Sequence, residues 1–453
     1  MTTLAEVRLW GRTIGAVALA EGERTAAFEY DPAFLHSDIQ VAPLTMPLST
    51  RVHRFPELPD DTFYGLPGLL ADSLPDKFGH RLIDAWLARQ GRSPESMNAV
   101  ERLCYTGKRG MGALEFRPRL GPRATRSTRL EVDALVALAS KALDDRGALR
   151  QAFGEDSSEK SMADILRVGT SAGGARAKAV IVWNRETNEV RSGQVDADPG
   201  FEHWLIKFDG VSGNRDRELN DPRGYCAIEY AFHRMALAAG IEMSECRLFE
   251  ENGRRHFMTR RFDRTEDGGK LHMQSLCAIA HFDYNQPGAY GYEQAFRVMR
   301  QLNLTMSEIE QQFRRMVFNI LGRNQDDHVK NIAYLMDRTG RWRLAPAFDL
   351  VYSYNPDGAW TARHQMTLNG KRDGFEFADF RACARTAGLK RGLDREIFEQ
   401  VRAAVARWPD FAREADIPET TIERISNGLR HETISTARQA PTPVENPGAK
   451  IRY

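Results

Sequence analysis

The apolar positions near the N-terminus come in short runs, and this pattern predicts β-strands. The runs VRLW, IGAVAL and TAAFEY lie between Val7 and about Tyr30, separated by glycine and polar residues. Short apolar runs bounded in this way are typical of hairpin strands. We therefore predict that residues 1 to about 50 are mostly β-structure.

A helix and a glycine turn complete the first predicted unit. The segment from about Lys77 to Arg89 predicts a helix with one apolar face, made of Leu82, Ile83, Trp86 and Leu87. Residues 107–118, GKRGMGALEFRP, predict a glycine turn that leads into a strand. The stretch GPRATRSTR at 121–129 is typical of a linker, so we place a β-rich N-terminal domain at residues 1–122.

Glycine loops and strands alternate in the middle of the chain. After a helix from Glu131 to about Leu143, residues 165–262 contain the strand-like runs KAVIVW, HWLIKF, RLFEE and RHFMTR. A helix from Tyr225 to Ala239 is predicted to face a sheet through Ile228, Ala231, Phe232 and Met235. These elements predict a small α/β lobe at residues 123–265.

Helical periodicity dominates the last third of the chain. Two apolar stripes at helical spacing are Ile309, Phe313, Met316, Val317 and Ile320, and then Ile397, Val401 and Val405. We predict a mainly α-helical lobe at residues 266–440 and a flexible tail at 441–453. The predicted fold class is therefore α+β, with a small and a large lobe preceded by a β-rich domain.

Composition narrows the class of protein without pointing to a ligand. A chain of 453 residues is too long for one core, and 63 basic against 62 acidic side chains give no reason to expect nucleic acid as the main ligand. The five cysteines form no C-x-x-C pair, which argues against a disulfide framework and a zinc site. Without a signal-peptide pattern or a stretch of about 18 apolar residues, we expect a cytoplasmic protein that does not contact a membrane.

The most informative polar cluster is LGRNQDDHVKNIAYL, which lies between two apolar segments. Asp326 and Asn331 stand there in the spacing D-x-x-x-x-N. Phosphoryl-transfer enzymes use this spacing for one residue that orients the acceptor hydroxyl and one that holds Mg²⁺. Alone the spacing is weak evidence, because the same residues could cap a helix or form a solvated turn.

Three further features stand in the order that a kinase requires. Asp349 follows an apolar strand in RWRLAPAFDLVYS, where a second carboxylate would reach the metal. The loop VGTSAGGARAK, with Gly169, Gly173 and Gly174, runs into a strand instead of a helix and lacks G-K-[ST], which favours a flap over phosphates and disfavours a Walker-A loop.

Lys207 is the third feature. In HWLIKFDG it projects from the face of the strand opposite to Trp204, Ile206 and Phe208, and a lysine inside an apolar strand needs an anionic partner. Glu229, on the following helix, is a candidate for that partner. The alternatives are an edge-strand lysine that reaches water and a glutamate on the surface.

The combined order predicts a bilobal protein-kinase-like fold that uses Mg-ATP. Asn324-Gln325 replaces the H-R of H-R-D, Phe348-Asp349-Leu350 replaces D-F-G, and no A-P-E segment follows. An ordinary eukaryotic-type kinase is therefore excluded.

The chain resembles the HipA toxins of bacterial type II toxin–antitoxin systems in the strings GTSAGGARAK, HWLIKFDG, RRFDR, DDHVKN, APAFDL and GMGALEF. The resemblance implies a serine/threonine protein kinase with Asp326 as catalytic residue, Asn331 and Asp349 as Mg²⁺ ligands and Lys207 on the α- and β-phosphates. It also implies further ATP-binding residues, which are Gly173, Gly174, Ala175, Arg176, Ala177 and Lys178 in the nucleotide loop, Arg260, Arg261 and Phe262 in the adenine hinge, His328 and Lys330 beside the phosphates, and Phe348.

The resemblance further implies a regulatory site and partners. Ser171 falls where the family places an autophosphorylated serine, with Thr170 as an alternative acceptor, although Ser171 could also be an ordinary turn residue. A phosphate there would repel the ATP phosphates. The implied partners are a HipB-like helix-turn-helix antitoxin, through which alone the chain would reach DNA, and a protein substrate such as an aminoacyl-tRNA synthetase.

Two other functions stay open from the sequence. A small-molecule phosphotransferase shares D-x-x-x-x-N but usually has His at the position of Asn324. The chain could also act as an inert corepressor with a DNA-binding antitoxin. The intact set of Lys207, Asp326, Asn331 and Asp349 argues against inertness.

Overall fold

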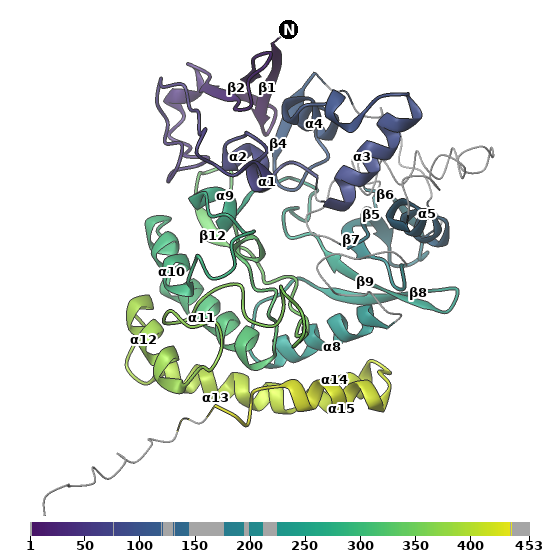
Figure 1. Cartoon of the computed structure of the whole chain (residues 1–453), viewed down its shortest axis with the longest axis vertical. Helices are drawn as coiled ribbons and strands as arrows, with labels where there is room; N and C mark the ends of the chain where they lie inside the picture. The colour runs from purple at the N-terminus through teal and green to yellow at the C-terminus, as the bar shows by residue number, and fades with distance from the viewer. Residues whose placement is uncertain are drawn as a thin grey trace, which may run out of the picture.

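The computed structural model describes residues 2–75, 77–118, 120, 130, 132–144, 176–193, 199–211, 224–434 and 436. The predicted linker around residue 122 and the predicted tail at 441–453 lie outside these ranges. The described residues form an α+β protein, in which an N-terminal domain packs against a small lobe and a large lobe (Figure 1). The fold class predicted from the sequence is confirmed.

The N-terminal domain is built on a four-stranded antiparallel sheet in the order β3-β2-β1-β4. Its strands are β1 (Thr3–Leu9), β2 (Arg12–Leu19), β3 (Ala27–Tyr30) and β4 (Leu114–Arg117). The prediction of β-structure to about residue 50 was too long, because strands end at Tyr30 and only turns and the short helix η1 (Phe34–His36) follow. Prolines at positions 32, 43 and 47 lack the N–H that a strand ladder needs.

Short helices connect the first three strands to β4 and reach both lobes. They are α1 (Asp60–Phe63), α2 (Gly68–Ala71), α3 (Lys77–Arg89), η2 (Pro94–Ser96) and α4 (Ala99–Thr106). Helix α4 begins with a capping box, in which Asn98 accepts a hydrogen bond from the Glu101 N–H and the Glu101 carboxylate accepts one from the Asn98 N–H.

The small lobe contains a five-stranded antiparallel sheet in the order β6-β5-β7-β9-β8. Its strands are β5 (Lys178–Asn184), β6 (Val190–Ser192), β7 (Phe201–Lys207), β8 (Cys246–Glu251) and β9 (Arg254–Arg260). One face is covered by α3 and by α5 (Val132–Asp144), through a core that joins Phe78 and Leu82 to Trp204 and Ile206 (Figure 1). The N-terminal domain therefore shares a core with the small lobe.

Helix α8 (Tyr225–Ala238) joins the small lobe to the large lobe. The stripe of Ile228, Ala231, Phe232 and Met235 was predicted to face the sheet, but it belongs to the large core that includes the large lobe. The Phe232 ring lies 5.1 Å from that of Trp408, between ring centroids. Cys226 and Tyr230 contact the sheet instead, beside Cys246 and Phe257. The helix is buried on both sides, which the hydrophobic pattern alone did not resolve.

The large lobe is mainly helical, as predicted, with one small sheet in the order β10-β11-β12. Its elements are β10 (His272–Ser275), α9 (Leu276–Ala280), α10 (Tyr292–Gln301), α11 (Met306–Leu321), η3 (Val329–Asn331), β11 (Ala333–Met336), β12 (Trp342–Leu344), α12 (Phe377–Ala387), α13 (Leu393–Ala406), α14 (Trp408–Glu414) and α15 (Glu419–Gly428). Both predicted apolar stripes are buried, on α11 and α13.

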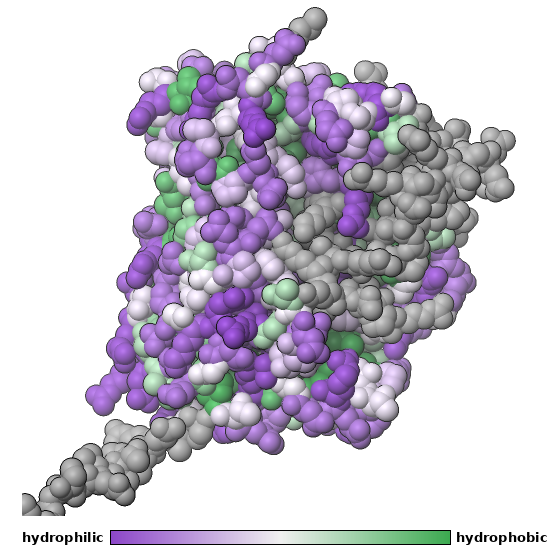
Figure 2. All heavy atoms as spheres, viewed as in Figure 1, coloured by the Kyte–Doolittle hydropathy of each residue, from purple (hydrophilic) through white to green (hydrophobic). Residues whose placement is uncertain are grey.

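The surface seen in Figure 2 is mostly hydrophilic, with apolar residues scattered over it. Among the helices that the structure describes, none is both long enough and apolar enough to cross a bilayer.

A buried ion cluster fastens the N-terminal domain to the segment between the lobes. The Asp263 carboxylate is fully buried and accepts hydrogen bonds from the Gly112 N–H at 2.7 Å, from Arg261 at 2.7 and 2.9 Å and from Arg264 at 2.8 Å. Gly112 has φ +77°, and a Cβ there would lie 3.0 Å from the Met273 nitrogen. Glycine is required at this position of the GMGALEF motif because the two backbones approach each other closely.

We expect Asp263→Asn to lower the free energy of unfolding by about 3–5 kcal/mol, because the change leaves two buried guanidinium groups without their anion. Burial would raise the pKa of Asp263, but Arg261 and Arg264 outweigh it and hold that pKa well below its ordinary value. The ionised carboxylate therefore stabilises the fold above about pH 4, and its contribution is lost as the pH falls below that value.

Thermal unfolding from pH 3 to 8 tests this expectation, with exposed Asp357→Asn as the matched control. The Tm difference between the natural protein and Asp263→Asn should be large at pH 6 and shrink below pH 4. A difference that stays constant with pH would contradict the account.

Candidate functional site

A cleft of about 250 Å³ opens where the two lobes and the N-terminal domain meet. Many predicted site residues line it, namely Arg176, Lys178, Lys207, Arg260, Arg261, Phe262, Asp326, His328, Lys330, Asn331, Phe348 and Asp349. The structure thus brings together residues that are up to 173 positions apart, from Arg176 to Asp349. Gly173, Gly174, Ala175, Ser171 and Thr170 lie outside the described residues.

Lys207 lies at the centre of this cleft, at the last position of β7. Its Nζ donates to Glu229 Oε1 on α8 at 2.5 Å and to Asp349 Oδ1 in the large lobe at 2.5 Å. The side chains of Lys207 and Glu229 are only 8% and 2% exposed. The pairing with Glu229 confirms the proposed partner, and the contact with Asp349 makes this lysine a direct link between the lobes.

The charges in this cluster are fixed by their mutual attraction. Burial would lower the pKa of Lys207, but Asp349 and Glu229 outweigh it and raise that pKa above its ordinary value. Burial would likewise raise the pKa of Asp349, and the charges of Lys207 and Lys178 hold it well below the ordinary range. Lys178 stands opposite Lys207 in the register of β5 and β7. Asp349 therefore stays ionised at neutral pH, as a metal ligand must.

Asp349 also has an unusual backbone conformation, with φ +53°. Aspartate tolerates this left-handed region better than most residues, at a cost of about 1 kcal/mol. Its carbonyl oxygen accepts a hydrogen bond from Asn324 Nδ2 at 3.2 Å, and its carboxylate is held by Lys207. These contacts turn the Asp349 side chain toward the cleft.

The loop between α11 and β11 carries Asp326 and Asn331. Asp326 is 38% exposed, and its Oδ1 accepts a hydrogen bond from Trp360 Nε1 at 2.6 Å. His328 Nε2 lies 3.9 Å from the same oxygen. Asn331 Nδ2 donates to the Asp326 carbonyl oxygen at 2.9 Å, which leaves the amide oxygen of Asn331 as its possible metal ligand.

Asp327 holds this loop in place and was not singled out from the sequence. Its fully buried carboxylate accepts hydrogen bonds from Tyr292 Oη at 2.7 Å, from His364 Nδ1 at 2.9 Å and from the Gln365 N–H at 2.8 Å. Burial would raise the pKa of Asp327, but His364 and the hydrogen bonds lower it. The sequence alone cannot show that Asp326 is exposed while Asp327 is buried and anchored, because the partners of Asp327 are distant along the chain.

The hinge segment, Arg260 to Phe262, has fewer backbone groups free to bind a nucleotide than the sequence suggested. The Arg260 and Arg261 N–H groups already donate to the carbonyl oxygens of Glu245 at 2.8 Å and His203 at 3.0 Å. The Phe262 N–H makes no hydrogen bond with the described residues. The Phe262 ring lies 5.6 Å from that of Phe348, and the two form an apolar wall. The side chain of Arg261 turns to Asp263 and its N–H donates to His203, so only its carbonyl oxygen is left for a ligand in the cleft.

The remaining predicted residues differ in how they relate to the cleft. The Lys330 ammonium group lies 5.2 Å from the Tyr284 ring centroid. Burial would lower the pKa of Lys330, but the negative charge of Asp72 is the main opposing effect and the pKa is raised. Arg176 stacks on the Tyr225 ring at 3.5 Å. Ala177 does not line the cleft, because its side chain belongs to the small-lobe core.

The N-terminal domain forms a third wall of the cleft that the sequence did not predict. Its contribution is Tyr64, Ala71, Asp72, Leu74, Pro75 and Met111. Asp72 fixes this wall, because its carboxylate accepts hydrogen bonds from the Ser275 N–H at 2.6 Å and from Ser275 Oγ at 2.9 Å. No local sequence pattern signals a contact across 203 positions.

The donor set fits a magnesium nucleotide. Mg²⁺ prefers carboxylate and amide oxygens and usually keeps several waters, which matches Asp349 and Asn331 at the edge of an open cleft. Lys207 and Lys178 supply cationic groups for phosphates on the neighbouring strands.

A second group of potential metal ligands, made of Asp133, Glu251 and His256, does not fit a metal. His256 Nδ1 accepts a hydrogen bond from the Asp209 N–H at 3.0 Å, so the neutral ring carries its proton on Nε2. That proton occupies the position that a metal would need, and Nε2 makes no hydrogen bond with the described residues. We assign this group a structural role.

Comparison with known proteins decides the family. Residues 5–117 match the HipA N-terminal domain, and residues 170–408, more than half of the chain, match the HipA-like C-terminal domain. The chain belongs to the HipA family.

One solved structure has a fold in agreement with this HipA-family assignment. The complex of the Shewanella oneidensis MR-1 toxin–antitoxin system, HipA and HipB with operator DNA, is 16% identical and covers 95% of this chain and 97% of that chain, with a TM-score of 0.66. The Helicobacter pylori proinflammatory kinase CtkA is 11% identical over 50% of this chain and 88% of that chain, with a TM-score of 0.33, too low to support an argument. A search of curated proteins gave no significant match.

In this HipA-family site we expect Lys207→Met to lower the free energy of unfolding by about 3–5 kcal/mol, because Glu229 is left buried and unpaired. A second change, Glu229→Gln, should recover most of that loss by removing the buried charge. Urea unfolding of both variants is the measurement, with exposed Lys390→Met as the matched control. If Lys207→Met unfolds like Lys390→Met, Lys207 does not carry the electrostatic role described.

Proposed function

We propose that this chain is a Mg-ATP-dependent serine/threonine protein kinase and the toxin of a type II toxin–antitoxin system. The observation that carries the proposal is Lys207, held between Glu229 and Asp349 in the cleft that also contains Asp326 and Asn331. Protein kinases require an ion pair between a strand lysine and a helix glutamate, together with a metal-binding aspartate, for activity.

Each residue has a defined task in the proposed reaction. Asp326 accepts the proton of the acceptor hydroxyl through Oδ2, because Trp360 already occupies Oδ1. Lys207 binds phosphate oxygens, and Asn331 and Asp349 hold Mg²⁺. The Phe262 N–H would contact the adenine, since it makes no hydrogen bond with the described residues. Bound Mg²⁺ would neutralise charge on the β- and γ-phosphates.

Trp360 is a positioning residue in this scheme. Its indole N–H fixes one oxygen of Asp326, so the other oxygen faces the acceptor in a defined direction. The segment that carries Trp360 is itself anchored to the loop by Gln325 Nε2, which donates to the Ala362 carbonyl oxygen at 3.4 Å, and by Gln365, whose N–H donates to Asp327. Orientation of a catalytic base in this way lowers the entropic part of the barrier.

Membership of the family supports proposals for the regulation and the partners of this chain. Phosphorylation of Ser171, or less favourably of Thr170, would add roughly −1.5 to −2 charges beside the nucleotide and stop its binding by repulsion. The fold shared with a HipA that forms a complex with HipB and operator DNA supports a HipB-like antitoxin as partner, with DNA reached only through it. We propose a protein target such as an aminoacyl-tRNA synthetase, whose phosphorylation would stop translation in the cytoplasm.

The test is incubation of the purified protein with Mg-ATP labelled on the γ-phosphate, alone and in cell lysate. We expect label on Ser171 and on one lysate protein, and we expect Asp326→Asn to reduce the rate by about 10²–10⁴-fold through loss of the proton acceptor. Ser171→Ala controls for the position of the self-label, and Asp357→Asn for a change of one exposed carboxylate. Undiminished labelling by Asp326→Asn would refute the assignment, whereas transfer to a sugar or antibiotic without protein labelling would show a small-molecule phosphotransferase.

A further inference from the structure

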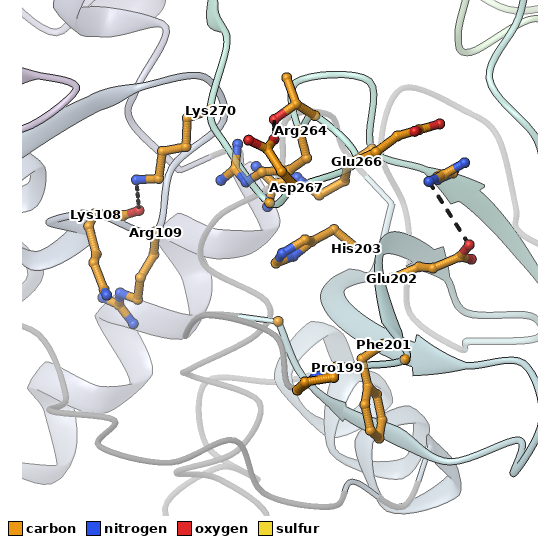
Figure 3. A pocket seen from close by; sticks show the side chains of 16 residues that line it. Lys108, Arg109, Pro199, Phe201, Glu202, His203, Arg264, Glu266, Asp267 and Lys270 are labelled. Atoms are coloured by element: carbon orange, nitrogen blue, oxygen red, sulfur yellow. Dashed lines mark hydrogen bonds and ion pairs between the residues drawn. The ribbon is translucent and has the colours of Figure 1, made fainter.

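A second cavity, of about 380 Å³, lies behind the hinge, and we call it the basic cavity. It is formed by the start of β7, the end of β9, the turn that follows it and the N-terminal domain (Figure 3). Six cationic residues line it, namely Lys108, Arg109, Arg260, Arg261, Arg264 and Lys270. Arg260 and Arg261, in the hinge, also line the cleft between the lobes that holds the proposed ATP site, which we call the nucleotide cleft. The hinge therefore separates the basic cavity from the nucleotide cleft.

The cations come from different walls of the basic cavity. Lys108 and Arg109 belong to the N-terminal domain, whereas Arg264 and Lys270 belong to the turn after the hinge (Figure 3). Lys270 Nζ joins the two walls by donating to the Lys108 carbonyl oxygen at 2.9 Å. A ligand that contacts both walls would therefore have to carry negative charge at more than one point.

The carboxylates nearby are largely committed to other groups. Glu202 accepts a hydrogen bond from Arg185 at 2.8 Å, and Arg260 reaches it only at 4.0 Å. Asp267 accepts hydrogen bonds from Thr265 and from the Gly269 N–H within its own turn. Glu266 also lines the basic cavity, where it is exposed and makes no ion pair with the described residues. The three lining carboxylates are therefore outnumbered by the six cationic residues.

Several cationic donors stay without a partner. The Lys108 ammonium group makes no ion pair or hydrogen bond with the described residues. Arg264 donates only through Nη1, to Asp263 and to the Gly112 carbonyl oxygen, and Arg261 only through Nε and Nη2. Among the described residues this leaves Nε and Nη2 of Arg264, Nη1 of Arg261 and Nζ of Lys108 available.

Burial and the neighbouring positive charges lower the pKa values of two residues in this cluster, although Glu115 and Asp263 oppose the shifts. Burial lowers the pKa of Lys270 to about 8 although Glu115 opposes the shift, and Arg264 and Arg261 add to it. Burial and the charge of Arg261 also lower the pKa of Arg264 to about 10, against the pull of Asp263. A bound anion would relieve this repulsion.

We propose that the basic cavity is a second ligand site that binds a small molecule bearing a pyrophosphate group. Guanidinium groups match phosphate oxygens in paired hydrogen bonds, and the cations on two walls require an anion with charge at both ends. The volume lies within the range of small-molecule sites and is too small for a folded partner. A ligand there would contact the hinge from the side opposite to the nucleotide.

Calorimetric titration of the full chain with inorganic pyrophosphate, without nucleotide or Mg²⁺, tests the proposal. Lys108→Met should weaken binding about tenfold, since one charge-assisted contact is lost while no contact of the described fold is removed. Arg264→Met should weaken it at least as much, and circular dichroism checks its folding because this residue also holds Asp263.

Two controls separate the basic cavity from the nucleotide cleft. Lys390→Met removes an exposed lysine elsewhere, and the Lys207→Met/Glu229→Gln double variant removes the central lysine of the nucleotide cleft. Lys390→Met should keep the pyrophosphate affinity of the natural protein. The double variant should lose only the binding that Lys207 contributes in the nucleotide cleft, and should keep the binding that Lys108→Met and Arg264→Met weaken. The proposal is overturned if pyrophosphate does not bind, if both basic-cavity variants bind as the natural protein does, or if only the double variant loses binding. None of these results depends on the labelling assay for the kinase.

Discussion

The buried contact of Lys207 with Glu229 and Asp349 is the interaction on which the site depends. It joins a strand of the small lobe, the helix between the lobes and a loop of the large lobe at one cationic atom. The Glu229 carboxylate would be costly to bury alone, and Asp349, which is 30% exposed, adds a second negative charge to the same ammonium group as the lobes close around the cleft. The same closure places two metal-ligand candidates and the lysine proposed to bind phosphate within one site.

The N-terminal domain is part of this arrangement and not an appendage. Helix α3 shares a core with the small lobe, Asp72 bonds to the start of α9, and Asp263 ties Gly112 to the hinge. The domain therefore contacts both lobes and the segment between them. A domain held in this way limits how far the lobes can move apart, and it forms walls of both the nucleotide cleft and the basic cavity.

The sequence predicted the parts of the fold that depend on local periodicity. The strands around Lys207, the stripes on α11 and α13 and the helix that carries Glu229 were all found, because each has a regular apolar spacing. The central site residues were also placed together correctly, since Lys207, Asp326, Asn331 and Asp349 line one cleft. Their chemical roles were predicted from spacing and resemblance and stay predictions.

What the sequence did not reveal depends on contacts between distant segments. Trp360 on Asp326, Tyr292 and His364 on Asp327, and the wall formed by Tyr64 and Asp72 have no local signature. Strands were predicted too far beyond Tyr30 because prolines, not polarity, end the sheet there. The side of α8 that carries Phe232 was assigned to the sheet because periodicity shows that a face is buried but not against what.

Calorimetric titration of ATP with and without Mg²⁺, for the natural protein and for Asp349→Asn, tests the central claim most directly. If Asp349 is the ionised metal ligand held by Lys207, Mg²⁺ should tighten ATP binding by about tenfold or more in the natural protein and have little effect in the variant. Equal tightening by Mg²⁺ in both proteins would contradict the account.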